Sequence, residues 1–245
     1  MVMQALVALV VLFSGFINAL TGFGFIIVAA PFLVLLLPPK QVAATALVLG
    51  LILSLMIAYR ERETINIGVV ISMASTAVFG IPIGAAVLAR VTPSTLKIMI
   101  GAIVIAVTLP ITRGFRLPAR RQLPLSLFAG FLSGVLSGIS GMSGAIAALF
   151  FTGYSWEPGQ IRPTIAAFNA TATTVTLAWL LLSGTIGRRE CWSALLSLPL
   201  VLLGLLLSNL LRLRVDHRHF RFLTFLLILI AGTLALVSGL LEIVR

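Results

Sequence analysis

The sequence is poor in charge, and poorest in acidic residues. Only 9% of its 245 residues are charged, and Asp and Glu number 6 against 17 Lys and Arg. A soluble domain carries about 25% charged residues, whereas here 60% of residues are hydrophobic and the mean hydropathy is +1.19. This composition excludes an ordinary soluble domain and indicates an integral membrane protein. In such a protein the net charge of +11 anchors loops, so we expect no nucleic-acid partner.

The sequence also lacks the residues that most enzymes and metal sites use. A single cysteine, Cys191, excludes an intramolecular disulfide and a multi-cysteine metal centre. The two histidines, His217 and His219, lie in an arginine-rich segment that we expect to be a solvated loop. The sequence contains no recognisable nucleophile–base pair or phosphate-binding loop. We therefore expect no enzyme activity, no cofactor and no bound metal.

The few carboxylates avoid the hydrophobic stretches. All 6 lie in predicted loops or at span ends, namely Glu61, Glu63, Glu157, Glu190, Asp216 and Glu242. Proton-driven carriers usually have an ionisable relay inside the membrane. We therefore do not expect coupling through a buried carboxylate, and Glu157 is the one candidate for it.

The hydrophobic residues form eight stretches separated by charged or proline-rich segments. Six have the length of one spanning helix, about 20 residues: residues 41–59, 65–89, 94–112, 161–184, 191–211 and 220–241. The other two, residues 4–37 and 123–153, are too long for one pass, and glycines interrupt both. We predict that each is a hairpin of two short helices that returns to the side from which it entered.

The basic residues support the hairpins. With two hairpins, most Lys and Arg fall on one face, in the loops at residues 60–62, 113–121, 162 and 212–221. With single crossings they divide almost evenly between the faces. The positive-inside rule therefore favours hairpins, with the arginine-rich face in the cytoplasm and both termini outside.

The two interrupted stretches are also similar to each other in sequence. Ser14, Gly15 and Gly22 match Ser133, Gly134 and Gly141, and the correspondence continues without a gap to Thr45 and Thr164. Each half then consists of a hairpin and three crossings, an odd number, so the second half starts from the opposite side. The predicted fold is an all-α polytopic membrane protein with two inverted repeats, residues 1–112 and 123–245, joined by a cytoplasmic linker at 113–122.

Two hairpins that enter from opposite faces bring their breaks together near the bilayer centre, which is typical of secondary transporters. Where a helix restarts, its first N–H groups are unpaired and its dipole favours an anion. The breaks and the helices that follow them therefore supply the candidate substrate-binding residues: Asn18, Thr21, Gly22, Phe23, Gly24, Thr45, Ser137, Ser140, Gly141, Met142, Ser143, Gly144, Thr164 and Asn169.

The glycines of the breaks and Arg162 each have a simpler interpretation as well. Glycines also let membrane helices approach one another, and the pair Gly134 and Gly138 has the spacing typical of such contacts. Arg162, at the start of its helix, either attracts or gates an anion, or only anchors the topology.

The glycine-rich breaks at residues 22–25 and 138–144, with the stretches 41–45 and 160–164 that follow them, resemble the TauE/SafE sulfite exporter family over nearly the whole chain. The resemblance implies a bacterial inner-membrane protein that exports a small oxyanion such as sulfite or an organosulfonate by alternating access. Its partners are then a small anion and the lipid bilayer, and its substrate region falls on Gly22, Gly24, Gly141 and Gly144. The alternatives are an uptake permease or channel for such an anion, or a membrane scaffold whose glycines only pack helices.

Overall fold

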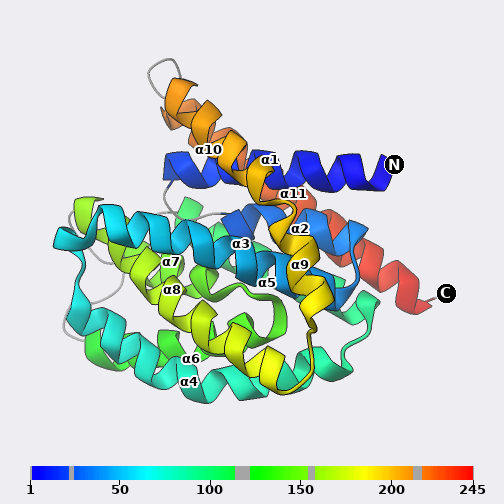
Figure 1. The fold of residues 1–245 in the computed structure, drawn as a ribbon, viewed down its shortest axis with the longest axis horizontal. Coiled ribbons are helices and arrows are strands. Elements are labelled where there is room, and N and C mark those ends of the chain that lie inside the picture. The colour runs from blue at the N-terminus through cyan, green and yellow to red at the C-terminus, as the bar shows by residue number, and fades with distance from the viewer. Residues whose placement is uncertain (1, 22–24, 114–121, 154–157, 212–216, 245) are drawn as a thin grey trace.

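The computed structural model describes residues 2–21, 25–113, 122–153, 158–211 and 217–244, which are almost entirely helical (Figure 1). The elements are α1 (Val2–Thr21), α2 (Phe25–Leu36), α3 (Pro39–Arg60), η1 (Arg62–Thr64), α4 (Ile67–Arg90), α5 (Pro93–Thr112), α6 (Gln122–Ser140), α7 (Ser143–Gly153), α8 (Pro158–Leu182), α9 (Arg188–Leu195), α10 (Leu198–Leu211) and α11 (His217–Val244). In the described residues, 7 helical segments are long and apolar enough to cross a membrane. The prediction of an all-α polytopic membrane protein is confirmed.

Both long hydrophobic stretches are broken into two helices, but the two arms are unequal. The first arms, α1 and α6, have 20 and 19 residues, whereas the second arms, α2 and α7, have 12 and 11. At 1.5 Å per residue the first arms are about 30 Å long, enough to span the hydrocarbon core. The first arms are therefore longer than the predicted short helices, because the glycines lie past the midpoint of each stretch.

The predicted span at residues 191–211 is interrupted as well. It consists of α9 and α10, which are separated by a turn at residues 196–197. Pro199 explains the break, since proline has no N–H to donate to the carbonyl four residues earlier, that of Leu195, where α9 ends, and its ring clashes with that carbonyl. The prediction of one continuous helix here is wrong.

Small residues bring the helices of the two halves into close contact. On α6, a Cβ atom at Gly134 would lie 2.2 Å from the carbonyl oxygen of Ala77 on α4. At the equivalent position on α1, a Cβ atom at Gly15 would lie 2.8 Å from the carbonyl oxygen of Val201 on α10. The packing role considered for Gly134 and Gly138 is thus the one that the structure displays.

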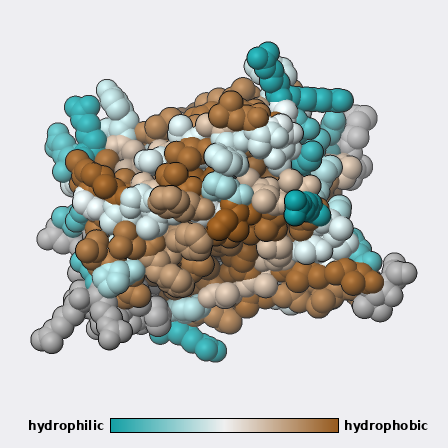
Figure 2. Space-filling view, turned by 90° about the horizontal axis from the view of Figure 1, so that it is seen from below, coloured by the Kyte–Doolittle hydropathy of each residue, from teal (hydrophilic) through white to brown (hydrophobic). Residues whose placement is uncertain are grey.

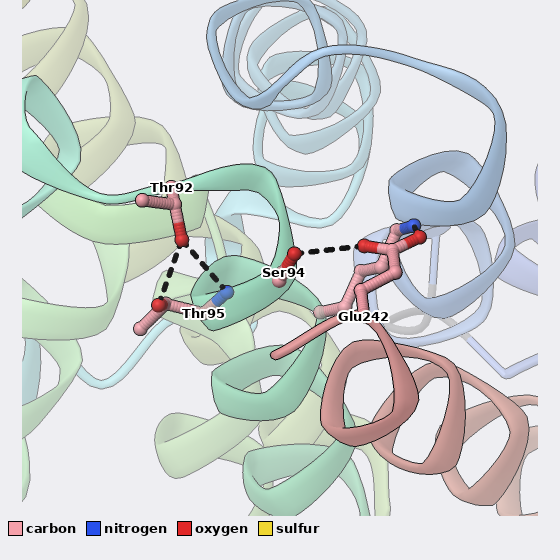
Figure 3. A network of polar contacts seen from close by, with 5 residues as sticks. Thr92, Ser94, Thr95 and Glu242 are labelled. Carbon is pink, nitrogen blue, oxygen red and sulfur yellow. Dashed lines mark hydrogen bonds and ion pairs between the residues drawn. The ribbon is translucent and has the colours of Figure 1, made fainter. Parts of the chain in front are cut away.

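Ion pairs join helix ends at the two faces of the molecule. At one face Arg162 Nη1 lies 3.0 Å from Glu61 Oε1, so two of the loops assigned to the arginine-rich face do meet. At the other, Lys97 of α5 pairs with Glu242 of α11, and Ser94 Oγ donates to Glu242 Oε2 at 2.8 Å (Figure 3). The start of α1 and the end of α11 lie on the same side of the molecule (Figure 1).

The outer surface is apolar. On α4, Ile67, Ile71, Phe79 and Ile83 are each at least half exposed. Figure 2 shows the molecule from that side, with hydrophobic residues across its middle and the most hydrophilic ones mostly toward its edges. Lipid is the solvent in which such a surface is stable.

Candidate functional site

The second break is a short turn whose backbone requires glycine. Helix α6 ends at Ser140, and the next residue, Gly141, has a φ of 77°. Its N–H donates to the carbonyl oxygen of Ser137 at 2.8 Å, which is the bond of a left-handed helix C-cap. A Cβ atom at Gly141 would also lie only 2.8 Å from Cβ of Ala46 on α3. Conformation and space therefore both select glycine here.

The break is buried between one helix of each half. Ser140, Met142 and Ser143 are at most 1% exposed. The first half contributes Ala46 of α3 against Gly141, and the second contributes α8, where Asn169 Nδ2 lies 2.8 Å from the place of a Cβ atom on Gly144. The helices α3 and α8 thus form the walls around the restart of α7.

The predicted polar residues of this break are bonded in three different ways. The Ser143 hydroxyl donates to Asn169 Oδ1 at 3.3 Å, which brings two predicted site residues together. The Ser137 hydroxyl lies 2.7 Å from Thr176 Oγ1 on α8. Ser140, in contrast, donates to the carbonyl oxygen of Leu136 in its own helix at 3.2 Å.

The first break is organised by Asn18 of α1. Its side chain is 5% exposed, and its Oδ1 accepts the N–H of Phe25, the first residue of α2, at 3.2 Å. Its Nδ2 has no hydrogen-bond partner among the described residues. Among the described residues, a buried amide donor is therefore left without a partner beside a helix N-terminus. Thr21 ends α1, and the predicted site residues Gly22, Phe23 and Gly24 lie outside the described residues.

The two matched threonines differ in their surroundings. Thr45 is 6% exposed and precedes Ala46, which contacts the second break. Thr164 is fully buried, but its hydroxyl accepts the backbone N–H of Asn66, in the turn before α4, at 3.0 Å. Thr164 therefore joins α8 to the other half near one face, and only Thr45 lies next to a break.

Arg162 lies at that same face and is already paired with Glu61. Two open cavities surround this contact. One of about 310 Å³ is lined by residues including Glu63, Asn66 and Gln160, and one of about 540 Å³ by residues including Arg60, Arg62 and Gly159. The surface between the halves at this face is thus polar and bears both signs of charge.

The opposite ends of α3 and α8 are closed differently. There Ala43, Ala44 and Leu47 of α3 pack with Leu180 and Ile186, and all five are at most 2% exposed. One face of the α3–α8 contact is therefore held by an ion pair and a hydrogen bond, and the other by a dry apolar cluster.

Two buried hydroxyls on α8, those of Thr173 and Thr176, are not among the predicted site residues. With Asn169 they form an i, i+4, i+7 series, which lies on one helix face. Thr176 contacts Ser137, and Thr173 is 1% exposed with no partner for its hydroxyl in the described part of the chain. The spacing from Asn169 is the signal that identifies them.

In the part of the chain that the structure describes, no three His, Cys, Asp or Glu side chains are grouped so as to hold a metal ion. The family model described as "Sulfite exporter TauE/SafE" matches residues 7–235 of the chain. No curated protein and no solved structure matched it.

Proposed function

Because the chain belongs to the TauE/SafE sulfite exporter family, a family of membrane transporters, we propose that it exports a small oxyanion by alternating access. Sulfite and organosulfonates are the proposed substrates, and a bacterial inner membrane with the arginine-rich face in the cytoplasm is the proposed location. The multi-pass character of the chain is the premise from which the mechanism follows.

The observation that carries the proposal is the buried pair of helix restarts. The first N–H groups of a helix have no partner within it, and its dipole favours negative charge. At the start of α7 these groups are enclosed between α3 and α8, and at the start of α2 the free Nδ2 of Asn18 adds a donor. Such sites bind anions through amide hydrogens alone. They hold an oxyanion less tightly than an arginine cluster, which suits a carrier that must release it.

The helix contacts support two inverted repeats, residues 1–112 and 123–245. If α1 to α5 correspond to α6, α7, α8, the pair α9 and α10, and α11, the most extensive contacts between the halves occur in equivalent pairs. The contact of α4 with α6 corresponds to that of α10 with α1. The contact of α4 with α8 corresponds to that of α9 with α3, and the contact of α2 with α11 corresponds to that of α7 with α5. The contact of α3 with α8 and the contact of α5 with α11 each join two helices that occupy equivalent positions in the two halves.

Alternating access then follows from the two ends of the α3–α8 contact. Separating Glu61 from Arg162 and Asn66 from Thr164 opens a path from the polar cavities toward the breaks, while the apolar cluster keeps the other end closed. Arg162 exchanges its carboxylate partner for the arriving oxyanion, since both present oxygens that guanidinium binds. The gating role of Arg162 is part of this proposal.

Flux into proteoliposomes tests the proposal. Saturable flux of radiolabelled sulfite is expected for the purified chain, and Asn18→Ala is expected to reduce it at least tenfold, because the free donor and the cap on α2 are both lost. Thr108→Ala, which removes a buried hydroxyl near the end of α5, is the control and keeps wild-type flux. Flux that never saturates would indicate a channel. Absence of flux for sulfite and for sulfonates, in folded protein, would contradict an anion carrier.

A further inference from the structure

The hydroxyl of Thr173 makes no hydrogen bond to its own helix. Threonines in apolar helices usually donate to the carbonyl four residues earlier. Thr171, Thr174 and Thr176 on α8 all do so, at 2.9, 2.7 and 2.8 Å. Thr173 does not, although it is 1% exposed, and no described residue offers its Oγ1 another partner. A buried polar group without a partner is uncommon in a native protein, and this hydroxyl oxygen is available to a ligand.

The neighbours of Thr173 show what it faces. One turn before it, Asn169 contacts Ser143 at the start of α7, and one turn after it, Thr176 contacts Ser137 in the last turn of α6. Residues 137 and 143 lie on either side of the second break. Since Thr173 lies between its two neighbours on the same face of α8, its hydroxyl is level with residues 140–141, where α6 ends.

The end of α6 supplies further oxygen atoms. The last carbonyl groups of a helix have no amide partner within it and carry the negative end of its dipole. The carbonyl of Ser137 accepts the N–H of Gly141, but the chain leaves the helix before amides can reach those of residues 138–140. Ile139 and Ser140 are 3% and 0% exposed, so these oxygens are enclosed within the protein.

This set of groups has the chemistry of a cation site. Hydroxyl, amide and backbone carbonyl oxygens are the ligands that alkali cations take where a membrane helix is broken. They are all neutral, which suits a monovalent ion rather than a divalent one, whose sites are built around carboxylates. The charge of a buried oxyanion also needs compensation, since an unpaired ion is costly to bury, and no described residue within two positions of residues 137–144 is basic.

We propose that Thr173 Oγ1, Asn169 Oδ1 and the last carbonyl oxygens of α6 bind Na⁺ beside the transported anion. The anion lies at the positive end of α7, and Na⁺ lies at the negative end of α6. The pairing of the two ions rests on the proposed transport of an oxyanion, whereas the cation site rests only on the oxygen atoms.

The test measures Na⁺ binding to the purified full-length chain without any sulfur oxyanion. Thermal stability is followed as NaCl replaces choline chloride at constant ionic strength, and ²²Na⁺ binding is measured in parallel. The wild-type chain is expected to gain stability saturably with Na⁺ and to bind the isotope. Thr173→Val keeps the shape of the side chain but is expected to weaken the Na⁺ response at least tenfold, and Thr173→Ser is expected to restore it.

Ser133→Ala is the matched control, because Ser133 is also fully buried with no hydroxyl partner in the described residues, but lies seven residues before the end of α6. It is expected to keep the wild-type response. Equal stability in Na⁺ and choline, an unchanged response in Thr173→Val, or an equal response to K⁺ would each overturn the proposal. Na⁺ binding without any anion flux would leave the cation site standing and contradict the proposed transport instead.

Discussion

Two asparagines hold the helix restarts, and they come from different elements. Asn18 of α1 accepts the first N–H of α2, whereas Asn169 of α8 accepts the hydroxyl of Ser143 at the start of α7. The two are not equivalent positions in the repeat, since Asn18 corresponds to Ser137 and Asn169 to Gly50. The two breaks thus reach a similar arrangement through different residues.

At the residue scale, Gly141→Ala is expected to destabilise the protein more than Gly184→Ala. Both glycines have positive φ, of 77° and 67°, which costs alanine about 1 kcal/mol. Only at Gly141 is the added Cβ crowded, by Ala46 at 2.8 Å, because no described atom lies within 4 Å of that position at Gly184. The difference between the two melting temperatures in detergent isolates the crowding, and equal losses would show that α3 does not press on the break.

Sequence reasoning predicted some of the residues that form polar contacts at the second break and missed others for a physical reason. Ser143 and Asn169 were predicted as site residues and do form a contact. Thr173 was not, because most threonines in apolar helices bond their own backbone, and packing alone decides which one does not. Likewise the partner of Thr164, Asn66, lies 98 residues away, and no local pattern indicates it.

The positions of the helices can be predicted from the sequence where the length of a hydrophobic stretch or an interrupting glycine determines them. Both breaks and the other spans appear near their predicted positions, because about 20 apolar residues are needed to cross the hydrocarbon core. The unequal lengths of the hairpin arms differ from the two short helices that were predicted for each hairpin. The turn between α9 and α10 was missed although Pro199 marks it.

At the element scale, Gly134→Ala is expected to separate α6 from α4. An added Cβ would lie 2.2 Å from the carbonyl oxygen of Ala77, and backbone cannot yield as a side chain can. We expect a loss of stability of about 1–3 kcal/mol, as for overpacked cores, seen as a lower melting temperature. Gly159→Ala is the control, because no described atom lies within 4 Å of its Cβ position in α8. A Gly134→Ala variant as stable as the control would contradict the close packing of α6 on α4.

For the whole molecule, the proposed alternating access depends on the two ends of the α3–α8 contact. The Glu61–Arg162 ion pair is about 30% exposed, and exposed pairs contribute at most about 1 kcal/mol. Its breakage is therefore easy compared with exposing the five apolar side chains at the other end. Because breaking the ion pair costs less than exposing the apolar cluster, we predict that the arginine-rich face opens first.

Charge reversal tests that order of opening. In a Cys191→Ser background, Gln160→Cys lines the cavity beside Glu63 and Asn66 and reports access by maleimide labelling. Glu61→Arg is expected to raise the labelling rate severalfold, because it repels Arg162. Adding Arg162→Glu is expected to restore the original rate by re-forming the pair in reverse. A rate that Glu61→Arg does not change would show that the ion pair is no gate.

The most direct measurement of the central claim is an experimental structure of the protein with selenite, whose selenium marks an oxyanion of the same shape as sulfite. The account predicts a selenium peak at the restarts of the broken helices, within hydrogen-bond reach of Asn18 Nδ2 and of the first amides of α2 or α7. A peak confined to the arginine-lined cavities beside Glu61, with none at the restarts, would contradict it.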